Sequence, residues 1–162
     1  YGVIVAQARQ PALYTRHEVA DTVDGRFEMV VLHTILVLDR LQADPAGQKV
    51  AQAVFDLFCV DMDRSLREMG IGDLGVPKRM KTMTERFYGR ANAYREALAA
   101  RDGAALAAVL ARNVYDRETP AAAGLAAYVL AAHDALSTSL PGAPQSVAAS
   151  LPDPADFAGV IA

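Results

Sequence analysis

Acidic and basic side chains come close together in the segment 61–67, where an acid–base site could form. Asp61 and Asp63 make a carboxylate pair, and Arg67 follows Asp63 by four positions. Paired carboxylates are groups that general acid–base catalysis uses. In a helix, however, side chains two positions apart point to different sides, which weakens a shared role. We therefore predict that the protein is not an enzyme. An acid–base site at these three residues stays an alternative, which a strongly perturbed carboxylate pKa would favour.

Histidine and cysteine offer a second kind of chemistry, the ligation of a metal or haem. His33 lies in an apolar run that is typical of a hydrogen-bonded core histidine, and His133 has no Cys or His at coordinating spacing. The lone Cys59 has mostly apolar neighbours and indicates a small core residue. We predict no cofactor and no metal. A helical small-molecule or haem-binding protein with His33 or His133 as the axial ligand stays open as the alternative function.

A glycine motif suggests nucleotide binding by its letters alone. Gly70, Gly72 and Gly75 match the pattern GxGxxG. That pattern binds a dinucleotide when a strand leads into the glycines and a helix begins beneath the pyrophosphate. Here an amphipathic helical segment precedes the glycines, and Pro77 follows them. We interpret the motif as a helix–helix turn that binds no nucleotide.

Positive charge is concentrated in residues 76–101, which contain seven basic and two acidic residues. At about 100° per residue, four arginines fall within a wedge of about 60° that flanks the apolar side of the predicted helix: Arg79, Arg86, Arg90 and Arg101. Such a block is usually a solvated face. The functional interpretation is a docking strip for an anionic or mixed surface, such as RNA or a nascent chain.

Apolar residues at helical spacing predict the elements that position these groups. The run Phe27–Leu41 is apolar nearly all round, which indicates a buried central helix, and Asp21 or Thr22 is suited to cap it. The other predicted helices are 1–9, 50–69, 77–98, 106–114 and 125–136, with 10–20 as a connection that includes a short turn. Gly70 fits the left-handed residue that ends the helix 50–69, and Pro77 fits the first turn of the next helix.

The fold prediction is therefore an all-α, single-domain bundle of about six helices. Alanine is the most frequent residue, which also favours helix. The helical domain is predicted to occupy residues 1–139. A Pro-rich tail, residues 140–162, is predicted to be partly ordered at most, because its prolines oppose a regular element, with Phe157 and Ile161 as anchors.

Composition limits the class of protein and its partners. The net charge is -3 and the pI is about 5.6, which excludes a generally basic nucleic-acid coat, and we expect no DNA partner. The single cysteine excludes an intramolecular disulfide and fits a reducing compartment. The longest uncharged apolar stretch, Ala121–Ala132, is too short to span a bilayer. We expect a cytoplasmic protein, in contact with a membrane only peripherally.

Several blocks of the sequence together resemble the ubiquinol–cytochrome c chaperone family. They are DTVDGRFE at 21–28, LH at 32–33, DMDRSLREMGIGDL at 61–74, VPK at 76–78 and FYGR at 87–90. The resemblance runs from Tyr1 to about Tyr115 and does not cover the Pro-rich tail. The Ala- and Arg-rich composition suggests a bacterial member.

The resemblance implies an all-helical, non-enzymatic assembly factor for the cytochrome bc1 complex. Mitochondrial members bind newly made cytochrome b near the ribosomal tunnel exit, together with a small partner protein. We therefore expect cytochrome b as a partner, with the tunnel exit and a small partner protein as further expectations. Peripheral contact with the inner face of the cytoplasmic membrane is also consistent with this role. The candidate partner-binding residues are Asp61, Asp63, Arg64, Arg67, Lys78, Arg79, Arg86, Tyr88 and Arg90.

Methionine and aromatic residues are concentrated around the 70–75 turn, where they could form either a binding groove or a core. They are Met62, Met69, Met80, Met83, Phe87 and Tyr88. Flexible, polarizable methionines suit a groove that adapts to apolar helices. The same residues are also sufficient to make an ordinary core.

Overall fold

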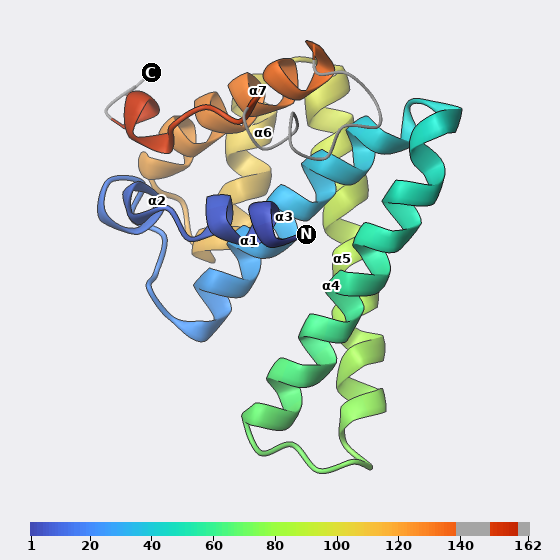
Figure 1. Ribbon diagram of the computed structural model, residues 1–162. Helices are drawn as coiled ribbons and strands as arrows, with labels where there is room; N and C mark the ends of the chain where they lie inside the picture. Colours follow the sequence, from blue (N-terminus) through green and yellow to red (C-terminus); the bar gives the residue numbers. More distant parts are fainter. Residues whose placement is uncertain (139–149, 159–162) are drawn as a thin grey trace.

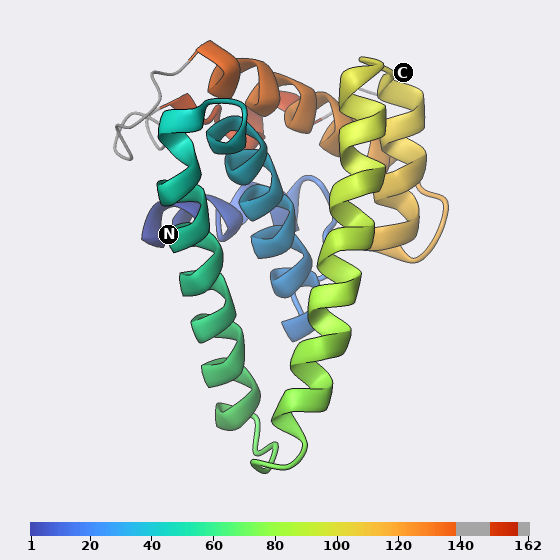
Figure 2. The same cartoon turned by 90° about the vertical axis from the view of Figure 1, so that its right-hand side faces the viewer.

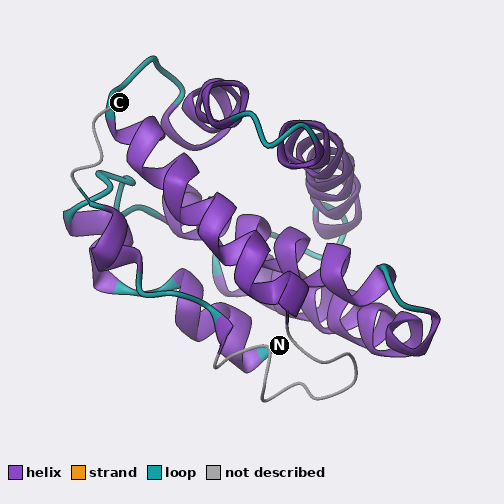
Figure 3. Cartoon of the chain, turned by 90° about the horizontal axis from the view of Figure 1, so that it is seen from above, coloured by secondary structure: helices purple, strands orange, loops and turns teal. Residues whose placement is uncertain are grey.

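The computed structural model describes residues 1–138 and 150–158, and within them the chain is helical with no strand (Figures 1 and 3). The α-helices are α1 (Gly2–Ala8), α2 (Pro11–Thr15), α3 (Val23–Gln42), α4 (Gln48–Glu68), α5 (Val76–Ala99), α6 (Gly103–Leu110) and α7 (Ala121–Thr138). Two 3-10 helices and one π-helical turn add to them: η1 (Pro45–Gly47), η3 (Pro154–Phe157) and η2 (Ala111–Tyr115). The prediction of an all-α bundle is confirmed.

Helix α3 is the centre of the fold, and α1, α4 and α7 all pack against it. Every residue from Glu28 to Leu38 is buried, as the apolar run predicted. The Thr22 hydroxyl accepts a hydrogen bond from the Gly25 backbone N–H at 3.1 Å, which confirms Thr22 as the N-cap. Gly25 itself is required by close packing, because a Cβ atom there would lie 2.0 Å from the Ala20 carbonyl oxygen.

Helices α4 and α5 form a long antiparallel hairpin whose closed end projects beyond the other helices (Figures 1 and 2). We call residues 61–86 the distal hairpin, and the remaining described residues the body. The two helices meet through aromatic side chains, and the tilted rings of Phe58 and Phe87 lie 5.2 Å apart between centroids. The predicted amphipathic segments 50–69 and 77–98 correspond to these helices.

The turn between α4 and α5 has the geometry that Gly70 predicted. Gly70 has a φ of +83°, in the left-handed region. The Ile71 N–H donates to the Leu66 carbonyl at 3.1 Å, and the Gly70 N–H donates to the Arg67 carbonyl at 2.9 Å. This pair of bonds is the Schellman motif, which satisfies carbonyls that the helix end leaves free. The segment Gly70–Gly75 therefore joins two helices, and the interpretation of GxGxxG as a helix–helix turn is confirmed.

A chain of hydrogen bonds through the centre of the body ties three helices together. His33 is fully buried, and its two ring nitrogens bond the Met29 carbonyl and the Tyr128 hydroxyl, each at 2.7 Å. The Gln7 amide donates to the same Tyr128 oxygen at 3.1 Å. Buried polar groups of this kind stabilise a core only when they are paired, and here α1, α3 and α7 supply partners to one another.

The short turn predicted within 10–20 is a helix, and the tail holds a short helix where we predicted no regular element. The connection 10–20 contains the short helix α2, because Pro11 at its first position lacks the N–H that a helix start leaves unpaired. The tail contains η3, in which Pro154 takes the same kind of position after the capping Asp153. Phe157 packs on Tyr128, with ring centroids 6.0 Å apart, and so anchors the tail as predicted. Ile161 lies outside the described residues.

Candidate partner-binding surface

The acidic and basic residues at the end of α4 pair with one another rather than with a bound group. Arg67 contacts the carboxylates of Asp63, at 2.7 Å, and of Asp73 in the turn. Arg64 pairs with Glu68 at 2.8 Å. All these side chains are exposed, and exposed pairs contribute little to stability. Their structural effect is local, because Arg67 connects α4 to the turn.

Asp61 and Asp63 do not act as a pair. The Tyr1 hydroxyl donates a 2.8 Å hydrogen bond to Asp61, while Asp63 faces Arg67. Burial, and then the hydrogen bond to Asp61, raise the pKa of the Tyr1 hydroxyl above its ordinary value. The two carboxylates thus have separate partners, and this arrangement gives no support to the acid–base alternative.

The basic residues predicted as a stripe on α5 divide into two groups. Lys78, Arg79 and Arg86 are exposed and form no ion pair with a described residue. Arg90, in contrast, does not belong to an exposed stripe. Its guanidinium pairs with Glu28 of α3 at 2.6 Å, and both side chains are only 10% exposed. Arg101 also has a partner, Asp134 of α7, at 2.6 Å.

The Glu28–Arg90 pair connects α3 to α5 inside the molecule. Burial raises the pKa of the Glu28 carboxyl, and the positive charges of Arg90 and Arg86 offset part of that rise. Glu28 Oε2 and Arg90 Nε are buried without a hydrogen-bond partner. A helical wheel gives an angle around one helix, but it does not show that α3 lies against this part of α5. The sequence therefore placed Arg90 on the surface.

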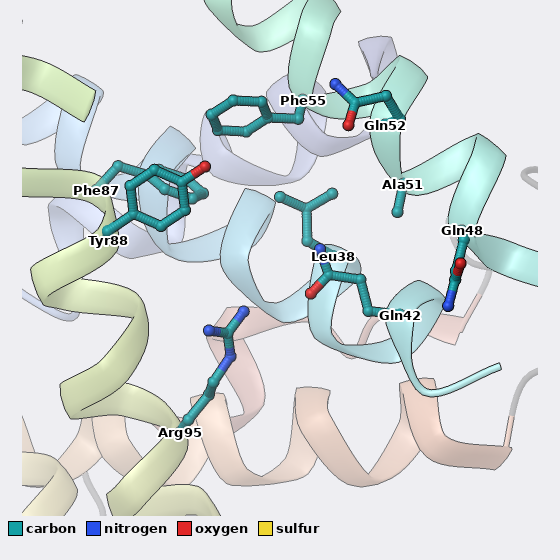
Figure 4. A pocket seen from close by; sticks show the side chains of 9 residues that line it. All are labelled: Leu38, Gln42, Gln48, Ala51, Gln52, Phe55, Phe87, Tyr88 and Arg95. Carbon is teal, nitrogen blue, oxygen red and sulfur yellow. The ribbon is translucent and has the colours of Figure 1, made fainter. Parts of the chain in front are cut away.

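An open pocket of about 480 Å³ lies between α3, α4 and α5 (Figure 4). Its lining mixes aromatic, amide and aliphatic side chains, and consists of Leu38, Gln42, Gln48, Ala51, Gln52, Phe55, Phe87, Tyr88 and Arg95. Phe55 is the centre of the aromatic part, with ring centroids 5.5 Å from Phe87 and 6.0 Å from Tyr88. Arg95 is held at the other side by Asp39 of α3 at 2.6 Å.

Sequence reasoning found only part of this pocket. It named Tyr88 and Phe87 but missed the rest of the lining. Those residues come from three helices, and no single-helix period shows that they meet. One local feature points to this region: Phe55 lies next to Val54 and Phe58, so the apolar face of α4 is broader here than a single stripe.

The methionine and aromatic residues around the turn also divide into two groups. Met62 and Phe87 are buried, and Met80 and Met83 pack against the core. This agrees with the ordinary-core interpretation for these four. Met69 and Tyr88, in contrast, are each 53% exposed. Leu74, which the sequence did not single out, is 99% exposed at the tip of the turn.

The candidate ligands for haem or metal are not arranged as a site. Both ring nitrogens of His33 are already hydrogen bonded, and burial lowers its pKa to about 4 against an opposing effect of the Met29 carbonyl. His133 lies beside Asp134 at 3.7 Å. In residues 1–138 and 150–158, no three His, Cys, Asp or Glu side chains converge as metal ligands. Cys59 is half-buried against the core, and burial raises the pKa of its thiol.

No helix of the described segments combines the length and the apolar character needed to span a bilayer.

Comparisons with known proteins identify the family. Residues 15–140 match the family described as ubiquinol-cytochrome C chaperone. The crystal structure of the Cbp3 homolog from Brucella abortus is similar, with 48% sequence identity and a TM-score of 0.80. The similarity covers 93% of this chain and 83% of that one. No curated protein matches the chain significantly. The match to the family and the similar fold agree with the sequence blocks at 21–28 and 61–74, and the chain belongs to the ubiquinol–cytochrome c chaperone family.

Proposed function

We propose that this protein is a non-enzymatic chaperone that binds newly made cytochrome b during assembly of the cytochrome bc1 complex. The observation that carries the proposal is the open pocket between α3, α4 and α5, in a chain of this family. The side chains of Phe55 and Tyr88 offer aromatic surface, and Gln48 and Gln52 offer amide groups beside them. Such a lining suits a segment of a client protein that is mostly apolar but has polar groups without hydrogen-bond partners.

The physical task explains why a mixed lining is useful. Cytochrome b is a membrane protein, and its apolar helices need shielding until they are inserted and filled with haem. Aromatic side chains bury a large area at small loss of conformational freedom. Amides donate and accept hydrogen bonds with little dependence on sequence. The pocket would therefore hold a client segment reversibly rather than enclose it.

The charged residues of the distal hairpin are proposed as a second part of the partner surface. Asp61, Asp63, Arg64 and Arg67 on α4, with Arg86 on α5, lie along the hairpin whose proximal half lines the pocket. We assign them to contacts with the client or with a small partner protein, while Lys78 and Arg79 suit an anionic surface. Arg90, which we predicted as a contact residue, would act by fixing α5 to α3. A ribosome contact near the tunnel exit and a location at the inner face of the cytoplasmic membrane complete the proposal.

Capture of tagged cytochrome b from cells that are synthesising it tests this function. Tyr88→Ser removes a half-exposed aromatic side chain from the lining of the pocket. We expect recovery to fall roughly tenfold, which corresponds to about 1.4 kcal/mol of binding free energy. Val23→Ser is the matched control, since Val23 is an exposed apolar residue on the body. Equal recovery with both variants would contradict the assignment of the pocket.

A further inference from the structure

The apex of the α4–α5 hairpin presents apolar side chains to solvent at the point farthest from the body. Leu74 is 99% exposed and Met69 is 53% exposed. Ile71 lies between them in the same turn. The apex projects beyond the other helices in two perpendicular views (Figures 1 and 2). A leucine in this position adds nothing to the core, so its apolar surface is available to a partner.

The apex is held in a defined shape. The Schellman bonds fix its first residues, and Arg67 holds Asp73 beside Leu74. On the other side, the Gly75 N–H donates to the Gly72 carbonyl at 2.8 Å. Leu74 is therefore presented by a hydrogen-bonded turn rather than by an unconstrained loop.

Positive charge directly follows the apolar apex. Lys78 and Arg79 lie in the first turn of α5, and neither forms an ion pair with a described residue. Lys81 is only weakly engaged, with its nitrogen 3.9 Å from Glu85. Among the nearby acidic groups, Glu68 pairs with Arg64, while Asp63 and Asp73 share the single guanidinium of Arg67. Residues 63–81 contain five basic and three acidic side chains, so the net charge around Leu74 is positive.

We propose that the hairpin apex docks on an anionic lipid bilayer, with Leu74 and Met69 in the interface and Lys78 and Arg79 at the lipid headgroups. Peripheral proteins combine apolar and basic side chains in this way, because the first enter the boundary of the acyl chains and the second are attracted to anionic lipids. A convex apex with one protruding leucine fits a surface that deforms around it. RNA would use the cations but has no need of Leu74, whereas a protein would need a matching hollow.

This inference gives a structural basis to the proposed membrane location. Its test uses only the purified protein and vesicles, so it can fail while client binding stands. The protein is sedimented with vesicles of phosphatidylcholine alone or of phosphatidylcholine and phosphatidylglycerol in equal amounts. We expect binding to the anionic vesicles only, and weaker binding as salt is raised. Absence of binding to the anionic vesicles would overturn the proposal.

Two pairs of variants separate insertion from simple charge attraction. Leu74→Asp and the double change Lys78→Glu with Arg79→Glu should each weaken binding at least tenfold. Their controls, Val23→Asp on the body and Lys49→Glu with Arg117→Glu far from the apex, should bind as the wild type does. If the charge variant loses binding and Leu74→Asp does not, the apex is not inserted, and the proposal is wrong. If the protein binds an RNA fragment but not the vesicles, and the charge variant alone loses this RNA binding, the apex contacts nucleic acid and the proposal is wrong.

A fluorescent probe locates the contact directly. A polarity-sensitive dye is attached at position 74 in the variant Leu74→Cys with Cys59→Ser, and at position 23 in Val23→Cys with Cys59→Ser. Anionic vesicles should shift the emission of the dye at position 74 to the blue and leave the dye at position 23 unchanged. Equal shifts, or no shift at position 74, would overturn the assignment of the apex.

Discussion

The body and the distal hairpin use the same kinds of side chain in opposite ways. In the body, even charged and polar groups are buried and paired across helices, as in Glu28 with Arg90 and His33 with Tyr128. In the distal hairpin, the ion pairs join residues of the hairpin itself, and only Asp61 contacts the body, through Tyr1, among the bonds of its charged side chains described above. Leu74 and Met69 face solvent. Polar groups in the body thus hold helices together, while those in the distal hairpin leave its surface free for partners.

The largest expected difference between the two regions comes from two arginines one helical turn apart. Arg90→Met removes the partner of a buried carboxylate, and breaking a buried pair in this way is expected to lower the free energy of unfolding by about 4 kcal/mol. Arg86→Met, at an exposed position of the same helix, is expected to change it by less than about 0.5 kcal/mol. Chemical denaturation of both variants measures this contrast.

A double variant then identifies the cause. Adding Glu28→Leu to Arg90→Met replaces the whole pair by apolar groups, so most of the lost stability should return. Similar losses for the Arg86 and Arg90 variants would show that the pair is effectively solvated and that our distinction between the regions is wrong.

The second prediction concerns pH and the buried histidine. The pKa of His33 is lowered to about 4 in the folded protein, mainly by burial, whereas an unfolded histidine titrates near 6.5. Because the folded state favours the neutral ring, the stabilising contribution of His33 is complete above about pH 6.5 and is lost as the pH falls toward 4. The shift corresponds to about 3 kcal/mol.

Comparison with His33→Gln isolates this contribution, since the carboxylates titrate in both proteins. The free energy of unfolding of the wild type should fall more steeply than that of His33→Gln between pH 6.5 and 4. Parallel curves would mean that His33 is protonated without penalty, and the central hydrogen-bond chain would then need another explanation.

The sequence predicted well those features that depend on one helix at a time. The period of apolar residues predicted α3, α4, α5 and α7. Residue type narrowed the cap of α3 to Asp21 or Thr22 and predicted the left-handed Gly70. These features arise from backbone hydrogen bonding and from burial of one face. Both depend on residues that are close together in the sequence.

The features that depend on contacts between helices were missed. Burial of Arg90 requires Glu28, which is 62 residues away, and the pocket requires residues of α3, α4 and α5 together. A helical wheel of α5 alone does not distinguish an exposed arginine from a buried one, because it does not contain the neighbouring helix. The candidate residues all lie in the α4–α5 hairpin, but the sequence did not separate those on the surface from those inside.

Two glycines, both in helices of the body, show a similar contrast between a packed and an open position. A Cβ atom at Gly25, in the body, would meet the Ala20 carbonyl oxygen at 2.0 Å, whereas nothing lies within 4 Å of one at Gly89 in α5. Gly25→Ala should therefore destabilise the protein by about 2 kcal/mol through steric overlap. Gly89→Ala should stabilise it by up to about 1 kcal/mol, because alanine is the better helix former. Thermal unfolding of the two variants should thus shift in opposite directions, and a shared direction would contradict the packing at Gly25.

The smallest expected effect separates the shape of the apex from its packing. Gly70 has a left-handed φ but open space around it, while Gly72 has open space and no such φ. Gly70→Ala should therefore lower the free energy of unfolding by about 1 kcal/mol from backbone strain alone. Gly72→Ala should raise it by about 0.5 kcal/mol by restricting the unfolded chain. Because the strain lies at the end of α4, amide hydrogen exchange in Gly70→Ala should speed up near residues 66–71 and stay unchanged in α3. Faster exchange throughout α3 would show that the distal hairpin and the body unfold as one unit, and that the two regions differ in surface chemistry but not in stability.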